Sequence, residues 1–251
     1  MVDWEGQIQS GWLYGVITFA GLIIGGAFWA RRFRKTPESF SIFVGAIIGA
    51  YAGAKVLFLL AEWERIFGDP HWFLLAISGK TIVGALLGGY AGVEIAKRLI
   101  GHREPTGDWF ALGVPLAIAA GRLGCLRYGC CQGMVCESTV SFSTIGRDGL
   151  SRWPAVPLEI AFNLLFVAAI LPFVLRPLRV SPLFKGQFFH CYLIAYGLFR
   201  FWHEFHRDTP RVFGGISGYQ IGALFLVVLG LWRGWRRYLS RDAECLKSPR
   251  K

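Results

Sequence analysis

The sequence is poor in charged residues. Asp, Glu, Lys and Arg make up only 17% of the 251 residues, whereas hydrophobic residues make up 54%. Soluble domains carry about a quarter charged residues, so this chain has too little polar surface to cover its apolar residues in water. The composition therefore predicts a protein that is surrounded by lipid.

The sequence also lacks the short motifs of several soluble enzyme classes. It contains no nucleotide-binding loop, no serine-hydrolase elbow and no zinc-protease helix. The N-terminus reads Met1-Val2-Asp3-Trp4-Glu5 and lacks the basic region of a cleavable signal peptide, so we expect the first apolar run to remain as a membrane span. If the protein is an enzyme, its substrate reaches it through the bilayer.

Acidic residues are scarcer than basic ones, and the formal net charge is +11. Such an excess can indicate nucleic-acid binding, but nucleic-acid readers gather Lys and Arg on an aqueous face or a basic helix. Here the basic residues stand between apolar runs, which is typical of membrane proteins. We therefore expect contact with anionic lipid headgroups and no nucleic-acid partner.

The apolar runs predict an all-α membrane protein that forms one integral domain over residues 1–251. Because a helix needs about 20 mostly apolar residues to cross the bilayer, we expect a bundle of about seven transmembrane helices. Their predicted positions are 11–30, 41–62, 77–96, 109–126, 155–175, 186–203 and 218–235. The apolar run at 72–77 is too short to span, and we interpret it as an interfacial or re-entrant piece.

The distribution of Lys and Arg among the loops predicts the orientation. One set of alternate loops carries most of these residues, and such loops face the cytoplasm. This places the N-terminus outside and the C-terminus in the cytoplasm. On this topology, residues 127–154 form an extracytoplasmic loop or arm, and residues 239–251 form a basic cytoplasmic tail.

The second and third predicted spans each carry a glycine at every fourth position. These glycines are Gly45, Gly49, Gly53, Gly84, Gly88 and Gly92. This spacing puts a stripe without side chains on one helix face, where another backbone can approach closely. We expect two tightly packed helices, an interpretation that we favour over an internal repeat.

Charged side chains inside a span cost roughly 2.5–3.5 kcal/mol and therefore need an explanation. Arg122 lies near the outer end of the fourth span, close to Gly121 and Gly124. The glycines leave room for a ligand, and an arginine can hold a phosphate with two parallel hydrogen bonds. We favour this function over the alternative, an arginine that extends to the lipid headgroups.

A second charged group stands at the outer end of the sixth span. If the helix continues, Arg200, Glu204 and Arg207 share one face. Arg200 and Glu204 then form an ion pair, and Glu204 orients Arg207. A purely structural pair explains the pattern equally well, and Arg207 taken alone is typical of a surface charge.

Three further polar residues lie near the same membrane face. Tyr14 follows the start of the first span and alone is typical of an interfacial aromatic. Lys80 precedes the third span and is a candidate contact for a lipid or substrate. Glu159 begins the fifth span.

Two charged residues lie deeper in the bundle or towards its other face. Lys55 lies inside the second span, and we predict no role for it beyond extension to the interface. Glu94 is expected to pair with Lys97 or Arg98 at the cytoplasmic face.

Four cysteines, Cys125, Cys130, Cys131 and Cys136, lie within twelve positions of each other. Their spacing does not match the usual metal-ligand pairs. Disulfides are an alternative in an oxidising compartment, although Cys130 and Cys131 are adjacent and not expected to bond to each other. Packing of small residues between helices accounts best for Cys125.

Several stretches of the chain together carry a resemblance to a known family. They are Gly121-Arg122-Leu123-Gly124 with Gly129 and Gly133, Tyr196 to Arg207, Trp12-Leu13-Tyr14-Gly15, Pro154 to Glu159 with Asn163, and Gly218-Tyr219-Gln220. These stretches resemble the landmarks of the prolipoprotein diacylglyceryl transferase family, and the resemblance covers most of the chain.

The resemblance implies transfer of a diacylglyceryl group from phosphatidylglycerol to the lipobox cysteine of a lipoprotein precursor, in the bacterial cytoplasmic (inner) membrane. Arg122 and Arg200 would hold the phosphate, Glu204 would orient Arg200, and Tyr14 would supply a hydroxyl. No metal and no dissociable cofactor are implied, because the lipid supplies the group. The substrate-binding residues implied are Lys80, Gly121, Gly124, Glu159, Arg207 and Gln220.

The sequence departs from the family pattern where the incoming thiol would be activated. Val83 stands at the place of a family histidine, Cys125 at that of an asparagine, and Cys130 at that of an acidic residue. Two alternatives stay open: a noncatalytic lipid-binding or transport-related protein, and a thiol-redox membrane protein that uses Cys125, Cys130 and Cys131.

Overall fold

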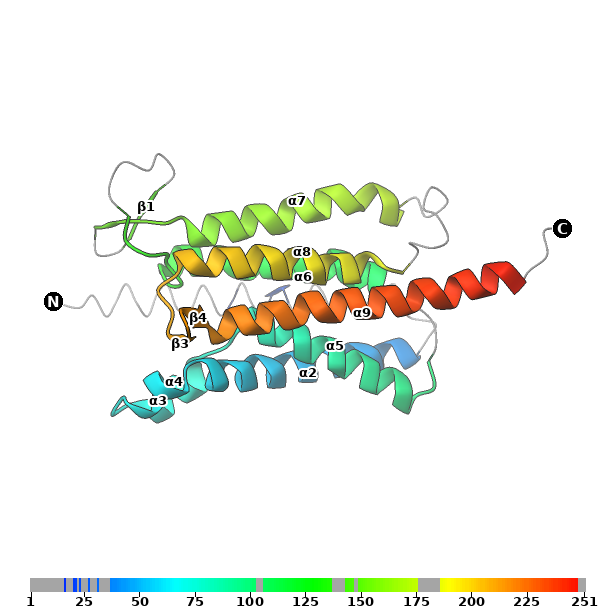
Figure 1. The fold of residues 1–251 in the computed structure, drawn as a ribbon, viewed down its shortest axis with the longest axis horizontal. Coiled ribbons are helices and arrows are strands. Elements are labelled where there is room, and N and C mark those ends of the chain that lie inside the picture. Colours follow the sequence, from blue (N-terminus) through cyan, green and yellow to red (C-terminus); the bar gives the residue numbers. More distant parts are fainter. Residues whose placement is uncertain are drawn as a thin grey trace.

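A computed structural model of the chain describes residues 37–102, 106–136, 143–146, 149–175 and 186–247, together with isolated positions between 16 and 31. The described part of the chain is mainly helical (Figure 1). Its long helices are α2 (Pro37–Ala61), α5 (Ile82–Leu99), α6 (Gly107–Tyr128), α7 (Ala155–Leu175), α8 (Phe188–His203) and α9 (Gly218–Lys247).

Short elements gather at one end of the helices (Figure 1). They are α3 (Trp63–Phe67), α4 (Trp72–Ser78), the 3-10 turn η2 (Glu204–His206), and strands β1 (Thr144–Ile145), β2 (Ser151–Arg152), β3 (Arg211–Phe213) and β4 (Ile216–Ser217). β1 pairs with β2 and β3 with β4, in both cases antiparallel. We call this the hairpin end of the bundle.

Among the described residues, three helices have the length and apolarity to cross a membrane, and they lie within α2, α6 and α7. α4 and α5 together pass the same test but are bent by 57° at their junction, which makes four if the pair crosses as one span. The re-entrant or interfacial piece predicted at 72–77 corresponds to α4. A mainly helical membrane fold is therefore supported.

The predicted count of about seven spans and the orientation of the termini stay predictions. The first predicted span lies almost entirely outside the described residues. α8 has only 16 residues, and α9 is not among the helices that pass the test. α9 also extends to Lys247, well beyond the predicted end at 235.

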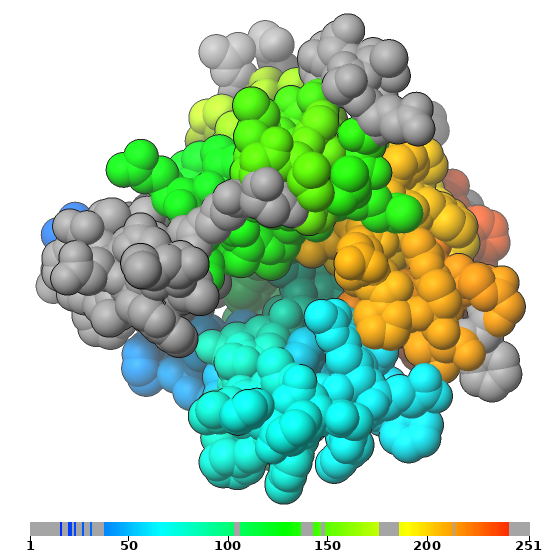
Figure 2. Space-filling view, turned by 90° about the vertical axis from the view of Figure 1, so that its left-hand side faces the viewer, coloured from blue at the N-terminus to red at the C-terminus, as the bar shows by residue number. Residues whose placement is uncertain are grey.

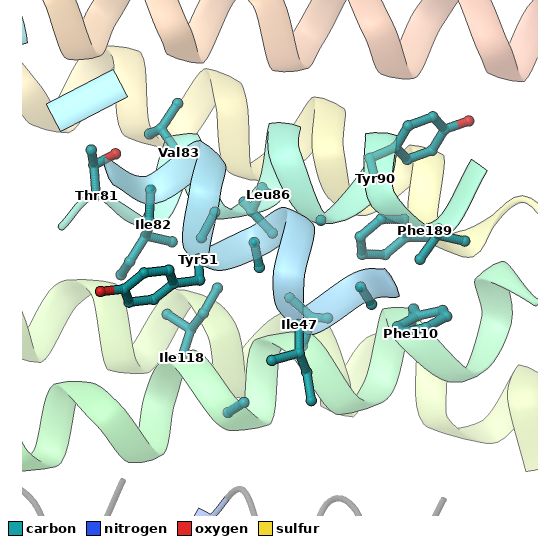
Figure 3. Close-up of a pocket in the computed structure, with 18 of the residues that line it drawn as sticks. Ile47, Tyr51, Thr81, Ile82, Val83, Leu86, Tyr90, Phe110, Ile118 and Phe189 are labelled. Atoms are coloured by element: carbon teal, nitrogen blue, oxygen red, sulfur yellow. The ribbon is translucent and has the colours of Figure 1, made fainter. Parts of the chain in front are cut away.

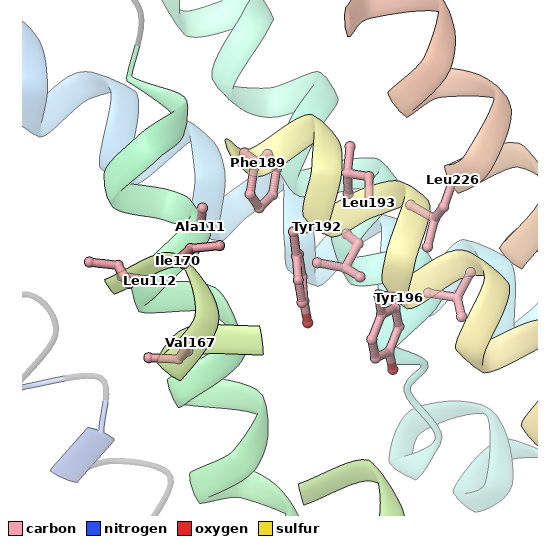
Figure 4. Packing of buried hydrophobic residues seen from close by; sticks show 11 residues of the cluster. Ala111, Leu112, Val167, Ile170, Phe189, Tyr192, Leu193, Tyr196 and Leu226 are labelled. Carbon is pink, nitrogen blue, oxygen red and sulfur yellow. The ribbon is translucent and has the colours of Figure 1, made fainter. Parts of the chain in front are cut away.

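The helices associate in pairs, α2 with α5, α6 with α7, and α8 with α9. A core cluster joins them around one face of α8, which contributes Phe189, Tyr192, Leu193 and Tyr196 (Figure 4). The cluster also includes residues of α6, α7 and α9. Because α8 lies in the middle of this cluster, it holds the other helices in register.

The glycine stripes of α2 and α5 face each other, as the sequence predicts. A Cβ atom built on Gly45 would lie 2.8 Å from the carbonyl oxygen of Gly92, and one built on Gly88 would lie 2.8 Å from the Cα of Gly53. Neither neighbour can move aside, because both are backbone atoms. The two backbones therefore touch directly along the stripe.

Lys55 has a role that the sequence analysis did not predict. Its Nζ donates to the carbonyl oxygens of Ala76, at 2.8 Å, and Ile77. These carbonyls belong to the last turn of α4, where unpaired acceptors and the helix dipole attract a cation. Lys55 thus fixes the short helix against α2.

We predict that Gly88→Ala destabilises the protein, because the added methyl group meets the backbone of α2. Overpacking of this kind costs about 1–3 kcal/mol, which thermal unfolding in detergent would measure. Gly113→Ala is the matched control, since a Cβ there meets no atom within 4 Å. Equal unfolding temperatures for the two variants would contradict close packing of α2 on α5.

Candidate active site

A buried carboxylate joins three helices near the hairpin end. Glu159 of α7 is completely buried, and its Oε2 lies 2.8 Å from Nη2 of Arg122 on α6 and 4.0 Å from Nη1 of Arg200 on α8. Both arginines are buried as well. The two guanidinium groups that the sequence analysis singled out therefore share one counter-ion.

Arg200 has a second carboxylate partner. Its Nη2 lies 2.6 Å from Oε2 of Glu204, so the ion pair predicted from the i, i+4 spacing is present. The predicted shared face does not include Arg207, because α8 ends at His203 and Arg207 follows η2 in extended conformation. The Glu204 carboxylate therefore pairs with Arg200, and no ion pair joins it to Arg207 among the described residues.

Two tyrosine hydroxyls form hydrogen bonds at Glu159 and at the neighbouring Asn163. Tyr196 donates to its Oε1 at 2.7 Å. Asn163, one turn along α7, donates to its main-chain carbonyl and accepts a hydrogen bond of 2.7 Å from Tyr192. These bonds satisfy buried polar groups, which would otherwise cost free energy, and they fix the position of the carboxylate.

Arg207 is placed by contacts between two loops. Gly133 forms a β-bridge with Arg207, Met134 donates its N–H to the carbonyl of His206 at 2.9 Å, and Trp153 stacks on His206 with ring centroids 4.3 Å apart. The segment that follows α6 thus holds the segment that follows α8.

The side chain of Arg207 is not the plain surface charge that the sequence suggested. Its Nε and Nη1 are buried and have no hydrogen-bond partner among the described residues. Burial lowers the pKa of Arg207, and the positive charges of Arg200 and Arg122 act in the same direction. A bound anion beside Arg207 would stabilise the charged guanidinium group and so oppose both effects.

Three thiols lie next to the arginines. The sulfur atoms of Cys125, Cys130 and Cys131 all lie within 4.8 Å of one another, and Nη1 of Arg122 lies 3.9 Å from Sγ of Cys125. Hydrogen bonds from the thiols of Cys125 and Cys130 lower the pKa of the Cys131 thiol, and Arg122 and Arg207 lower it further, whereas burial opposes them.

These groups open onto a cavity of about 1680 Å³ between the α2–α5 pair and helices α6, α8 and α9. Arg122, Arg200, Arg207 and all three thiols line it. At the hairpin end the molecule is hollowed between the α3–α4 region, in cyan, and the green and orange segments (Figure 2).

The middle of the cavity is apolar (Figure 3). Ile47 and Tyr51 of α2, Leu86 of α5, and Phe110 and Ile118 of α6 line it there. Charged groups thus stand at one end of a space whose walls suit hydrocarbon chains.

The opposite end of the cavity is also basic. Arg233 of α9 pairs with Glu94, and its Nε donates to the hydroxyl of Tyr90 at 2.8 Å. The predicted pairing of Glu94 with Lys97 or Arg98 is therefore wrong, because α9 packs beside α5 and brings a closer cation. A sequence taken alone does not reveal such a neighbour.

Comparison with known proteins identifies the family of this chain. A sequence profile described as prolipoprotein diacylglyceryl transferase matches residues 5–236. The chain belongs to this family. It is accordingly a transferase, and its apolar helices make it a membrane protein.

Individual members of the family match over most of their length. The phosphatidylglycerol–prolipoprotein diacylglyceryl transferase 2 of Clostridium perfringens is 28% identical, covering 87% of this chain and 88% of the relative. The transferase with the corresponding name from Gloeobacter violaceus is 30% identical, covering 94% and 91%. The one from a Marinomonas species is also 30% identical, covering 90% and 87%.

The structure brings some of the predicted site residues to the cavity and places others behind it. Those that line the cavity are Lys80, Gly121, Arg122, Cys125, Cys130, Cys131, Arg200 and Arg207. Those buried beside it are Gly124, Glu159, Glu204 and Gln220. Lys80 lies 5.5 Å from the ring centre of Tyr51, and Tyr14 lies outside the described residues.

Gln220 forms hydrogen bonds with neighbouring residues and does not line the cavity. Its Oε1 accepts from the N–H of Ser217 at 2.9 Å and from Arg211 at 3.2 Å, and its Nε2 donates to the carbonyl of Phe201. These bonds tie the β4–α9 junction to α8. Its effect on a substrate would therefore be indirect.

The sequence analysis missed one polar pair at the cavity. Glu62, at the end of the second predicted span, accepts a hydrogen bond of 2.8 Å from Tyr219 of α9, and both residues line the cavity. An acidic residue that directly follows an apolar span was the available signal, but its partner is 157 residues away in the chain.

We predict that Glu159→Gln destabilises the protein by about 3–5 kcal/mol, because it leaves two buried guanidinium groups without their shared counter-ion. Thermal unfolding in detergent or nanodiscs would measure the loss. Glu64→Gln on the exposed side of α3 is the control.

A double-mutant cycle then isolates the ion pair. Arg122→Gln combined with Glu159→Gln should lose less stability than the sum of the two single changes, by about 0.5–3 kcal/mol. Simple additivity would show that the two side chains do not interact.

Proposed function

We propose that this protein transfers a diacylglyceryl group from phosphatidylglycerol to the lipobox cysteine of a lipoprotein precursor, at the bacterial cytoplasmic membrane. The names of its relatives support this reaction. The single observation that carries the proposal is the set of unpartnered guanidinium N–H groups at the cavity. Nε of Arg122, Nη1 of Arg200, and Nε and Nη1 of Arg207 have no hydrogen-bond partner among the described residues.

The charges of the site favour an anion. Two buried arginines, Arg122 and Arg200, and the half-buried Arg207 stand against two buried carboxylates, Glu159 and Glu204. Positive charge is therefore in surplus among these five groups. The phosphate of phosphatidylglycerol carries one negative charge. A guanidinium group binds a phosphate through parallel hydrogen bonds and stays charged when it is dehydrated.

Each part of the site has a role in this reaction. The arginines bind the phosphate and stabilise the charge that develops on it as the glycerol phosphate leaves. Glu159 and Glu204 hold the guanidinium groups in place beforehand. The apolar middle of the cavity accepts the acyl chains, and the resemblance assigns a hydroxyl at the site to Tyr14.

The main alternative is a noncatalytic lipid-binding protein on the same scaffold, and Val83 favours it. This side chain, which stands where the family resemblance places a histidine, is 1% exposed and belongs to the hydrophobic core cluster. A thiol proton therefore finds no acceptor at that position. Binding of phosphatidylglycerol without turnover would support this alternative.

We expect Arg122→Lys to lower the transfer rate by a factor of about 10²–10³, the cost of removing one transition-state donor, because lysine keeps the charge and loses the planar fork. The measurement is the mass gain of a lipobox peptide in phosphatidylglycerol nanodiscs. Arg65→Lys on exposed α3 is the control.

Complementation gives an independent test in cells. The wild-type chain should restore growth to a strain depleted of its own transferase, and Arg122→Ala should not. If the wild type fails in both the cells and the peptide assay, the lipoprotein reaction is wrong for this chain.

A further inference from the structure

The three thiols beside Arg122 form a compact group that the proposed function leaves without a role. Cys125 lies in the last turns of α6, and Cys130 and Cys131 follow the end of that helix. Their sulfur atoms all lie within 4.8 Å of one another. The intervals of five and one residues do not predict this cluster, so it is a product of the local fold.

The backbone reverses at the end of α6 to bring the thiols together. Gly129 has a φ of 68° and donates its N–H to the carbonyl of Cys125, as does the N–H of Cys130 at 3.2 Å. Cys131 has a φ of 60° and is the only described non-glycine residue with a positive φ. Such a conformation is uncommon and strained for a residue with a side chain, and strained residues cluster at active sites and ligand-binding sites.

We infer that Cys125, Cys130 and Cys131 form a binding site for one Zn²⁺ ion, with the fourth coordination position open to the cavity. Zinc prefers thiolate ligands in a tetrahedral arrangement with Zn–S distances of about 2.3 Å, which separates the sulfur atoms by about 3.8 Å. The sulfur atoms lie within 4.8 Å of one another, so no pair has to close by more than about 1 Å to reach that spacing. Three protein ligands and one open position are typical of catalytic zinc sites.

The surroundings suit a zinc ion held by three thiolates. Such a complex carries one net negative charge, and Arg122 lies 3.9 Å from Cys125. Arg207 lines the same part of the cavity with its unpartnered N–H groups. With fewer anionic ligands the metal complex would be neutral or positively charged, and the arginines would not stabilise it. The site therefore favours a metal ion that binds three thiolates.

The inference rests on the proposed function for its chemical role, which is activation of the acceptor thiol. A free thiol has a pKa of about 8.5 and needs a base, but neither His203 nor His206 lines the cavity. The two histidines that line it, His102 after α5 and His190 at the start of α8, lie toward the opposite end from the thiols. A thiol that coordinates zinc is deprotonated outright. The three thiols line the same cavity as the arginines that would hold the phosphate.

The step balances without an oxidant or reductant. The acceptor cysteine replaces a water molecule on the zinc ion and releases its proton to solvent. Its sulfur attacks the lipid carbon that bears the phosphate oxygen, so a C–S bond forms as the C–O bond breaks and the electron pair leaves with the phosphate. The thioether product is a weaker zinc ligand than a thiolate and departs.

Metal binding tests the site without any assay of activity. The full-length protein, purified in detergent under reducing conditions and stripped with a chelator, should take up one equivalent of Zn²⁺, measured by elemental analysis after desalting. Co²⁺ in its place should give the thiolate-to-cobalt absorption of a tetrahedral site. Zinc uptake by the wild type no greater than that of the triple variant Cys125→Ser/Cys130→Ser/Cys131→Ser would overturn the inference.

Variants locate the ligands. Serine at position 125, 130 or 131 should weaken Zn²⁺ binding by more than about 100-fold, since losing even an outer partner of a metal ligand costs 10- to 100-fold. Cys136→Ser and Cys191→Ser are matched controls outside the cluster and should bind as the wild type does. Equal binding by the triple variant Cys125→Ser/Cys130→Ser/Cys131→Ser would overturn the assignment, as would a disulfide among these three residues in protein isolated without reductant.

Assays of peptide transfer and of lipid binding, each with and without zinc, distinguish failure of this inference from failure of the proposed function. Zinc-free protein should still bind phosphatidylglycerol but lose peptide transfer by more than about 100-fold, and added Zn²⁺ should restore it. Transfer that is unaffected by zinc removal would overturn the zinc inference and leave the proposed function standing. Protein that binds zinc and lipid but never transfers would refute the proposed function and the activating role, while the metal site itself would remain.

Discussion

The arrangement of this site depends on one buried carboxylate. Glu159 has no exposed surface and contacts two guanidinium groups from different helices. A charge inside a membrane protein is tolerated only when it is paired or faces a polar cavity. α6, α7 and α8 therefore cannot separate at this level without exposing an arginine or the glutamate to an apolar environment, and the ion cluster fixes their relative height in the bundle.

The same interaction explains why the arginines remain available to a ligand. Glu159 pairs with Arg122 and Glu204 with Arg200, yet Nε of Arg122 and Nη1 of Arg200 have no hydrogen-bond partner in the part of the chain that the structure describes. A guanidinium group carries five N–H donors in a rigid fork, so one carboxylate cannot satisfy it. The carboxylates thus hold the arginines in place, and the remaining N–H donors can bind a ligand in the cavity that both arginines line.

Local patterns could be predicted from the sequence, and contacts between distant segments could not. The four-residue spacing of Gly84, Gly88 and Gly92 predicted the packing of α5, and that of Arg200 and Glu204 predicted their ion pair, because both follow from helix geometry alone. The contact between Arg122 and Glu159 depends on how α6 and α7 pack, and no spacing along the chain encodes it.

Three errors have the same physical origin. Glu94 was assigned to Lys97 or Arg98 because they are close in sequence, yet Arg233 on α9 reaches it first. Lys55 was left without a partner because the helix end that it caps lies 21 residues further on. Arg207 was taken for a surface charge, since nothing in its own segment reveals that the loop after α6 holds it through Gly133.

The end of α6 connects the two chemical halves of the proposed reaction. Arg122 and Cys125 are one turn apart on the same helix, so a rotation or shift of this turn moves the phosphate-binding group and the thiol cluster together. The left-handed conformation at Gly129 sets where the helix stops, and only glycine adopts it without strain. On the proposed reaction, a single helix cap would align the group that binds the leaving phosphate with the thiol cluster that receives the attacking sulfur, and helix geometry fixes their separation before any substrate enters.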